Sequence, residues 1–180
     1  MGLFFTADTH FNHGSLIRLC GRPFENVDEM NESLIEKWNR TVDRDDIVYH
    51  LGDFAWRIGK KKMTALLTRL NGKKFLCHGT HDGRILKLAR YFEDIRDSFL
   101  IGVNGSQLIF MSHCLQKTWP ESDRGSWHLF GHSHGSRNAY AEQNGKLLDV
   151  GVDSHNFRPW SLKEIALVMA KRPPSPNGPR

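Results

Sequence analysis

The chain of 180 residues is 39% hydrophobic and 25% charged, and it carries a formal net charge of +5. These values describe an ordinary soluble protein of one domain, at most with a tail, and exclude a chain of several large domains. The positive charge suits anionic partners such as phosphate esters or nucleic acids. No apolar run approaches the roughly 18 residues of a membrane span, so we expect no membrane partner.

The three cysteines, Cys20, Cys77 and Cys114, are too few and odd in number for a disulfide framework, which favours a reducing compartment. Cys77 and Cys114 stand in apolar runs, so we expect small buried thiols rather than metal ligands. The first residues lead into a strand without the basic region of a signal peptide. We therefore expect a cytoplasmic protein.

The first half of the chain alternates short apolar runs with amphipathic segments. Met30, Leu34 and Trp38, for example, recur at helical spacing. The elements expected here are a strand ending near Asp8, a helical turn over 15–20, a helix over 28–42, a strand from Ile47, a helix over 60–70, a strand ending at Gly79 and a helix over 84–91.

The second half carries hairpin signals instead. Asn104-Gly105 stands between the apolar segments FLIGV and SQLIF, and Asn144-Gly145 stands between AYAEQ and KLLDV. Asn-Gly pairs favour the tight turns of β-hairpins, so both sites predict one. Helices alternating with strands and then hairpins indicate a mixed α/β fold rather than a purely parallel sheet.

The end of the chain predicts one last helix and a tail. Ser161 and Glu164 have the spacing of a capping box, which opens a helix. The stretch that follows is rich in proline. We expect a single domain over residues 1–170 and a disordered tail over residues 171–180.

Five short apolar runs end in metal-ligand chemistry. They are Leu3–His10, Ile47–Asp53, Phe75–Asp82, Leu108–His113 and His128–His134. Each run predicts a buried strand that delivers Asp or His to its C-terminal end. Carboxylate and imidazole ligands gathered at one sheet edge are typical of a two-metal hydrolytic site.

Single motifs within these runs are weak when taken alone. Asp8-x-His10 places two ligands at i and i+2, which share a face in an extended segment. Gly52 lets the backbone approach closely beside Asp53, whose carboxylate can bridge two cations. An aspartate at this place can equally be a turn or capping residue.

The last two runs are more specific. Gly131-His132-Ser133-His134 places two histidines behind a glycine, where they can serve two neighbouring ions. His113 ends a strand and adds an imidazole. A lone histidine there would more often belong to the core, but beside the other motifs we expect coordination.

Taken in order, the motifs resemble those of the calcineurin-like metallophosphoesterase family, in particular its small bacterial and phage members. The motifs concerned are Asp8-x-His10, Gly52-Asp53, Gly79-Thr80-His81-Asp82, His113 and Gly131-His132-x-His134. The resemblance implies the α/β class and a four-layer α/β/β/α sandwich, in which helices flank two mixed sheets. It also places a dinuclear metal site at the C-terminal ends of the strands.

The resemblance further implies a role for each motif residue. The first metal ligands would be Asp8, His10 and His134, the second metal ligands would be His113 and His132, and Asp53 would bridge the two ions. In the family a bridging hydroxide attacks phosphorus in line. His81 would assist the leaving group, and Asp82 would either orient His81 or cap the next helix.

Thr80 departs from the family pattern, which has asparagine at this place. The asparagine amide oxygen normally binds the second metal, whereas a threonine hydroxyl is a poor ligand. Thr80 would therefore bind weakly or leave its place to water. We expect reduced affinity for the second ion.

Three residues are candidates for substrate binding. Arg22 precedes a proline in a loop that can approach the site, and a guanidinium is well suited to phosphate; it can equally be a surface arginine. Asn12 and His13 follow the first ligand pair closely, so one of them could touch substrate.

The sequence thus predicts a metal-dependent phosphoesterase. A phosphodiesterase is favoured by family analogy, with a nuclease, a phosphomonoesterase or an inactive metal-binding scaffold as alternatives. Two divalent transition-metal ions are expected, manganese first, with iron, zinc or nickel as alternatives. The substrate would be a phosphate ester, either a small molecule or a nucleotide, with nucleic acid as a further option. The oligomeric state stays open.

Overall fold

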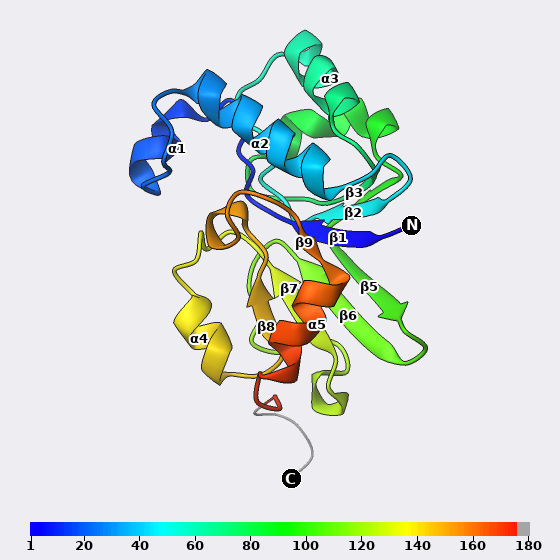
Figure 1. Ribbon diagram of the computed structural model, residues 1–180. Coiled ribbons are helices and arrows are strands. Elements are labelled where there is room, and N and C mark those ends of the chain that lie inside the picture. Colours follow the sequence, from blue (N-terminus) through cyan, green and yellow to red (C-terminus); the bar gives the residue numbers. More distant parts are fainter. Residues whose placement is uncertain (176–180) are drawn as a thin grey trace.

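Two mixed sheets lie face to face, and helices cover their outer faces, in a computed structural model that describes residues 1–175 (Figure 1). The first sheet has the strand order β4-β3-β2-β1-β9, and the second has the order β5-β6-β7-β8. This is the four-layer α/β/β/α arrangement that the family resemblance implied.

The first sheet is parallel except at one edge, where β9 runs antiparallel to β1. Its strands are β1 (Leu3–Thr6), β2 (Ile47–His50), β3 (Lys73–Cys77), β4 (Asp94–Arg96) and β9 (Trp160–Ser161). Because the four parallel strands point the same way, their C-terminal ends meet at one edge.

The second sheet combines one hairpin with two parallel pairings. Its strands are β5 (Ser98–Val103), β6 (Gln107–Ser112), β7 (Trp127–Phe130) and β8 (Leu147–Asp149). Asn104 and Gly105 have φ angles of 50° and 84° in the turn between β5 and β6. The hairpin predicted at this place is therefore confirmed.

The helices frame these sheets. The α-helices are α1 (Gly14–Leu19), α2 (Val27–Thr41), α3 (Lys60–Arg69), α4 (Asn138–Gln143) and α5 (Leu162–Ala170). The 3₁₀ helices are η1 (Asp82–Tyr91), η2 (Ser122–Arg124) and η3 (Val152–Ser154). The predicted helix over 84–91 is thus a 3₁₀ segment, interrupted by non-helical backbone at Leu88. None of the helices within residues 1–175 has the length and apolar character needed to span a membrane.

Alternating side chains divide the core between the layers. On β1, Phe5 packs between the two sheets, whereas Phe4 faces the cluster beneath α2 and α3. A third, smaller cluster includes Phe130 of β7 and Ala141 of α4, on the outer face of the second sheet. Strands such as β1 and β7 thus contribute to two apolar layers, as period-2 alternation allows.

The hairpin predicted at Asn144-Gly145 is wrong. The residues before the turn form helix α4, and β8 pairs with β7 in parallel. Alanine, glutamate and glutamine are good helix formers, and Ala141 gains burial on the second sheet. Gly145 has a φ of 116° and returns the chain into β8 rather than closing a hairpin.

The end of the chain differs in part from the expected tail. The capping box is confirmed, because the Ser161 hydroxyl accepts the Glu164 N–H and the Glu164 carboxylate accepts the Ser161 N–H. Beyond α5, Lys146 donates to the carbonyl of Arg172, and Ser175 is buried. Residues 176–180 lie outside the described part, so disorder there stays a prediction.

Candidate metal centre

The loops after five strands converge at one edge of the two sheets and are joined by backbone hydrogen bonds. Asp8 N–H donates to the Gly52 carbonyl at 3.0 Å, and Gly131 N–H donates to the His113 carbonyl at 2.9 Å. A further bond crosses between the sheets, from the His132 N–H to Asp8 Oδ2 at 2.8 Å. The fold thereby gathers the ends of the apolar runs.

One set of ligand-type side chains has two enclosed members and one, His134, whose side chain is 21% exposed. Asp8, His10 and His134 offer ligand atoms that lie within 4.8 Å of one another. Asp8 is 0% exposed and His10 is 2% exposed. We refer to these three residues as the buried group, and they are the set that the family resemblance implied for the first metal.

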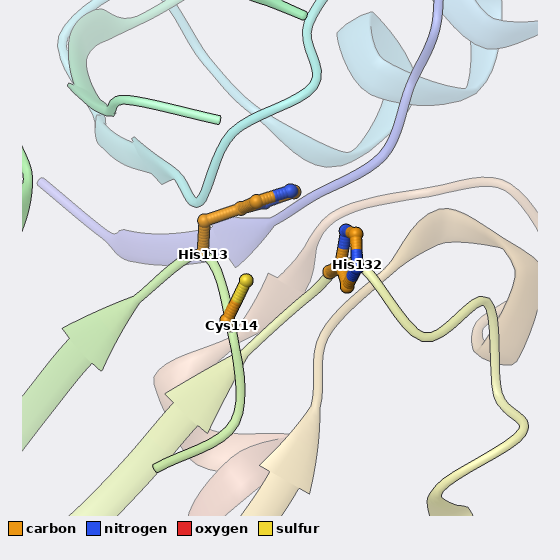
Figure 2. Close-up of side chains that lie close together, drawn as sticks. All are labelled: His113, Cys114 and His132. Atoms are coloured by element: carbon orange, nitrogen blue, oxygen red, sulfur yellow. The ribbon is translucent and has the colours of Figure 1, made fainter. Parts of the chain in front are cut away.

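A second set faces solvent. His113, Cys114 and His132 also offer ligand atoms within 4.8 Å of one another. Figure 2 shows the Cys114 thiol pointing from its loop toward the two imidazole rings. His113 is buried, whereas Cys114 and His132 are exposed. We refer to these three residues as the open group.

Asp53 lies between the two groups. Its Oδ2 atom is 3.4 Å from His10 Nε2 and 3.5 Å from His113 Nε2. Its Oδ1 atom accepts the His81 backbone N–H at 2.8 Å. One carboxylate oxygen is thus held by the protein, and the other faces both groups.

Buried polar atoms without partners show that these residues fit a cation. Asp8 Oδ1, His10 Nε2 and His113 Nε2 are all buried without a hydrogen-bond partner. Burial raises the pKa of Asp8 to about 8, because its carboxylate is removed from water. Burial lowers the pKa of His10 to about 3, which leaves the neutral imidazole that binds metals. Imidazole and carboxylate together suit divalent transition metals.

The candidate ligands are presented by an unusual backbone. Asp8, His10, Asp53, His132 and His134 have φ angles of 56°, 47°, 56°, 68° and 47°. Such left-handed conformations cost on the order of 1 kcal/mol or more outside glycine and gather at functional sites. The expectation that Asp8 and His10 share a face of an extended segment is therefore wrong. Their side chains meet because the chain turns at both residues after β1 ends.

Gly52 has the close-approach role that its position predicted. Its φ is +95°, and a Cβ atom there would lie 2.6 Å from His113 Nδ1 and 2.7 Å from Gly79 Cα. Only glycine combines this backbone with this space. Gly52 thereby brings the loop after β2 against the loop after β3.

The histidines are oriented by partners behind them. His113 Nδ1–H donates to the Leu51 carbonyl at 2.8 Å, which turns Nε2 toward the site. His134 Nδ1–H donates to Asp153 Oδ2 at 2.7 Å. A partner of this kind fixes the tautomer and raises the basicity of a metal-binding imidazole.

Arg22 is part of this scaffold, so its assignment to substrate binding is wrong. Its side chain is 0% exposed and forms a two-point ion pair with Asp153. The remaining donors reach the carbonyls of Asp8 and Thr9 and the sulfur of Met30. With every N–H engaged inside the protein, Arg22 positions the loop after β1 and cannot bind a phosphate from solvent.

Asp82 also has a positioning role. The sequence offered two roles for it, orienting His81 or only capping the next helix, and its contacts match neither. The carboxylate is buried and accepts three backbone N–H groups, from Asp53, Phe54 and Gly79, at 2.8–2.9 Å. It thereby fixes the loop that carries Asp53. Its assignment as a catalytic residue is not supported by these contacts.

His81 and His13 lie at the solvent side of the site. His81 is one-third exposed, with Nε2 3.8 Å from Asp53 Oδ2. The His13 ring stacks on Trp56 at a centroid distance of 4.6 Å, and the Trp56 ring also meets His81 edge-on at 4.6 Å. The Asn12 side-chain amide donates to the Trp56 carbonyl at 3.1 Å, which holds Trp56 against the two histidines.

The structure does not settle the role of Thr80, and it places one cysteine differently from the expectation. Thr80 is exposed in the turn after Gly79, and its role as a ligand stays a prediction. Cys114, expected as a buried thiol, is instead exposed beside His113 and His132. Cys77 is buried as expected.

Several contributing residues were missed from the sequence. Asp153 holds His134, while Asp149 accepts the Ser133 hydroxyl and the Gly135 and Gly151 N–H groups. Asp149 could have been found, because it also ends an apolar run. Nothing local marks Asp153, whose partner Arg22 is 131 positions away.

A pocket of about 340 Å³ opens beside the open group and was also missed. It is lined by Cys114, Leu115, Lys117, Gly131, His132, Ser133, Arg137 and Tyr140. It places two cations and one aromatic ring next to His132. The lining residues come from the loops after β6 and β7 and from the start of α4, and sequence spacing does not show that these three segments meet.

Comparison with solved structures identifies the fold. The protein of unknown function AQ665 from Aquifex aeolicus superimposes with a TM-score of 0.74 at 23% identity, over 93% of this chain and 98% of that one. A 5'-nucleotidase precursor from Thermus thermophilus gives a TM-score of 0.42 at 12% identity, over 86% of this chain and 42% of that one. The first match supports the two-sheet fold, and the second is too weak to bear on function.

Sequence comparison gives the family. No family model matches the chain. The Gene 66 protein of Mycobacterium phage L5 is 33% identical over 81 residues, which are 44% of this chain and 39% of that protein. The uncharacterized protein MJ1445 of Methanocaldococcus jannaschii is 34% identical over 173 residues, which are 94% of this chain and 92% of that protein. The chain therefore belongs to the same protein family as MJ1445.

Proposed function

We propose that this protein is a metal-dependent phosphoesterase that acts on phosphodiesters with two divalent metal ions. The observation that carries the proposal is the position of Asp53, whose Oδ2 atom lies within 3.5 Å of imidazole nitrogens from both groups. A carboxylate between two ligand clusters is the arrangement that a two-metal site requires.

The buried and open groups would each hold one ion, with Asp53 shared. When bound, two such ions supply Lewis-acid stabilisation of phosphate oxygens and lower the pKa of water. The protein's own contribution is to hold these ligands before substrate arrives. Asp82 fixes the Asp53 loop through three N–H groups, and Asp153 fixes the His134 ring.

His81 is the residue we assign to proton transfer. Its backbone N–H is anchored on Asp53 Oδ1, while its side chain is one-third exposed, so the ring faces both the site and solvent. His81 Nε2 would give its proton to the leaving oxygen of the ester. A general acid of this kind contributes about 10²–10⁴-fold to the rate.

The pocket beside the open group supports an anionic ester with a second organic group. Lys117 and Arg137 supply positive charge, and Tyr140, 40% exposed, offers an aromatic face. A monoester needs space for one organic group, whereas a diester needs space on both sides of phosphorus. The 340 Å³ pocket can accept the second one.

The test is metal analysis combined with hydrolysis of a substrate panel. Protein loaded with Mn²⁺ or Zn²⁺ is assayed against an aryl diester, an aryl monoester, cyclic nucleotides and single-stranded DNA. We expect two ions per chain and fastest turnover of a diester. Bound metal without hydrolysis of any ester would instead support the scaffold, and preference for DNA or a monoester would support those alternatives.

Asp53→Asn with Asp45→Asn as its control tests the role of the shared carboxylate. Both substitutions remove one negative charge, but Asp45 is exposed in the turn before β2. We expect Asp53→Asn to lower turnover by more than about 100-fold, since even partners behind metal ligands contribute 10–100-fold. Equal activity of the two variants would contradict the proposal.

A further inference from the structure

We infer that Cys114 is a thiolate ligand of the ion held by the open group, so that the two metal positions differ in chemistry. This inference rests on the proposed two-metal site and concerns one of its halves. It assigns the open group three ligands, His113, Cys114 and His132, with Asp53 shared.

Geometry is the first support. The Cys114 sulfur and one nitrogen each of His113 and His132 lie within 4.8 Å of one another. Figure 2 shows the thiol on the same side of the loop as both rings. The three side chains come from the loops after β6 and β7, two neighbouring parallel strands.

An unpartnered buried atom is the second and independent support. His113 is only 5% exposed, its Nδ1 is bound to the Leu51 carbonyl, and its Nε2 has no hydrogen-bond partner. With Nδ1–H donating, Nε2 is left as a buried acceptor, and a bound cation would satisfy it. Its nearest charged neighbour is Asp53 Oδ2 at 3.5 Å, the carboxylate oxygen that the two metal positions would share.

The distances can close without disturbing the core. In a tetrahedral zinc site with Zn–N near 2.1 Å and Zn–S near 2.3 Å, ligand atoms lie about 3.5 Å apart. The gap from 4.8 Å is within reach of side-chain rotation, because Cys114 and His132 are exposed while His113 stays fixed. The thiol would release its proton to solvent on binding.

A thiolate ligand would change which metal the open group prefers. A thiolate favours zinc, and disfavours manganese and magnesium relative to a site of oxygen and nitrogen ligands. The buried group lacks sulfur, so the manganese expected from the sequence applies there. Cys114 would also supply a stronger ligand than the neutral hydroxyl of Thr80, the residue that the family resemblance assigned to the second metal.

The experiment uses cobalt as a spectroscopic probe. Metal-stripped, reduced protein is titrated with Co²⁺ while the near-ultraviolet sulfur-to-cobalt charge-transfer band is recorded. Cys114→Ser is compared with Cys20→Ser, which removes a thiol that belongs to neither the buried group nor the open group. Competition between Zn²⁺ and Mn²⁺ for the second equivalent is measured on the same proteins.

We expect the band in the wild type and in Cys20→Ser once two cobalt ions are bound, and its loss in Cys114→Ser. We also expect Cys114→Ser to lower Zn²⁺ affinity at the second position by at least about 10–100-fold, with a much smaller change for Mn²⁺. Two bound cobalt ions without the band, or a band that persists in Cys114→Ser, would overturn the inference.

Hydrolysis measured on the same samples separates this inference from the proposed function. Ester hydrolysis with two cobalt ions and no thiolate band would leave the function standing and remove Cys114 from the site. A thiolate band without hydrolysis of any ester would support the ligand and count against the enzyme. Failure to bind cobalt at all would overturn both. Should Cys114→Ser not fold, the Cys20→Ser spectrum decides, because Cys77 is buried and leaves Cys114 as the accessible thiol.

Discussion

The buried and open groups use the same histidine chemistry but are built in opposite ways. In the buried group, Asp8 and His10 are enclosed, and His134 is backed by the ion pair of Asp153 and Arg22. In the open group, only His113 is enclosed and bonded to the backbone. For the proposed two-metal enzyme, this difference predicts that the buried group keeps its ion, whereas the open group can adjust and lies beside the pocket of about 340 Å³.

Removing one histidine from each group is the strongest test of this difference between the two groups. His134→Ala and His132→Ala should each lose one ion, and both should lower hydrolysis by more than about 100-fold, because two-metal chemistry needs both ions. The ion left in His132→Ala should stay bound through gel filtration, since the buried group is intact. Metal-to-protein ratios check this, and loss of both ions from His132→Ala would show that the groups are not independent.

Asp153→Asn should weaken the buried group from behind. The His134 imidazole would lose its charged partner, so we expect about 10–100-fold lower affinity for the first ion. Arg22 would be left as a buried, unpaired charge, which costs on the order of 3–5 kcal/mol of unfolding free energy. Denaturant unfolding of the metal-free protein and metal titration measure the two effects.

Glu32→Gln is the matched control for that change. It breaks the ion pair with Arg69, in which the Arg69 and Glu32 side chains are 48% and 62% exposed, and such pairs contribute about 0–1 kcal/mol. If Asp153→Asn destabilised the protein no more than Glu32→Gln does, the rigid design ascribed to the buried group would be wrong.

Asp8→Asn should separate stability from metal binding. Asp8 Oδ1 is buried without a partner, and burial raises the pKa of the carboxyl. An amide removes the charge, so the metal-free variant should gain about 1–3 kcal/mol of unfolding free energy while its first ion is lost. Thermal unfolding with and without metal measures both. A metal-free variant less stable than wild type would show that the carboxylate is already satisfied.

Thr80→Asn is expected to have the smallest effect and concerns the open group. It adds an amide oxygen, a harder ligand than sulfur, so Mn²⁺ should bind about tenfold more tightly while Zn²⁺ changes little. Thr68→Asn, on the exposed face of α3, is the control because threonine and asparagine have similar helix propensity. Unchanged Mn²⁺ affinity would place residue 80 outside the metal's reach.

The sequence predicted much of this fold because its signals are local. Apolar runs ending in Asp or His mark strands and the edge where they end, and Ser161 with Glu164 marks the last helix. The second hairpin failed because the same Asn-Gly signal also ends a helix. There, burial of Ala141 decided between the two outcomes.

The order of the motifs along the chain predicted which residues gather at the candidate site, but it did not predict how each side chain is used there. Arg22 was predicted to bind substrate, or else to be a surface arginine, because its partner Asp153 lies 131 positions away in the sequence. Asp82 acts through three backbone groups that no spacing reveals. The exposure of Cys114 depends on where the loop after β6 turns. Long-range contacts, rather than residue types, decide these roles.

The ligands come from two distant stretches of chain, residues 8–53 beside the first sheet and residues 113–134 beside the second. An ion bound by ligands from both stretches would link the two sheets, in addition to the apolar layer that both sheets share. Its binding free energy adds to the cohesion of the two halves, because an unfolded chain offers no such cage. Metal supply would then govern how long the folded protein survives as well as what it can do.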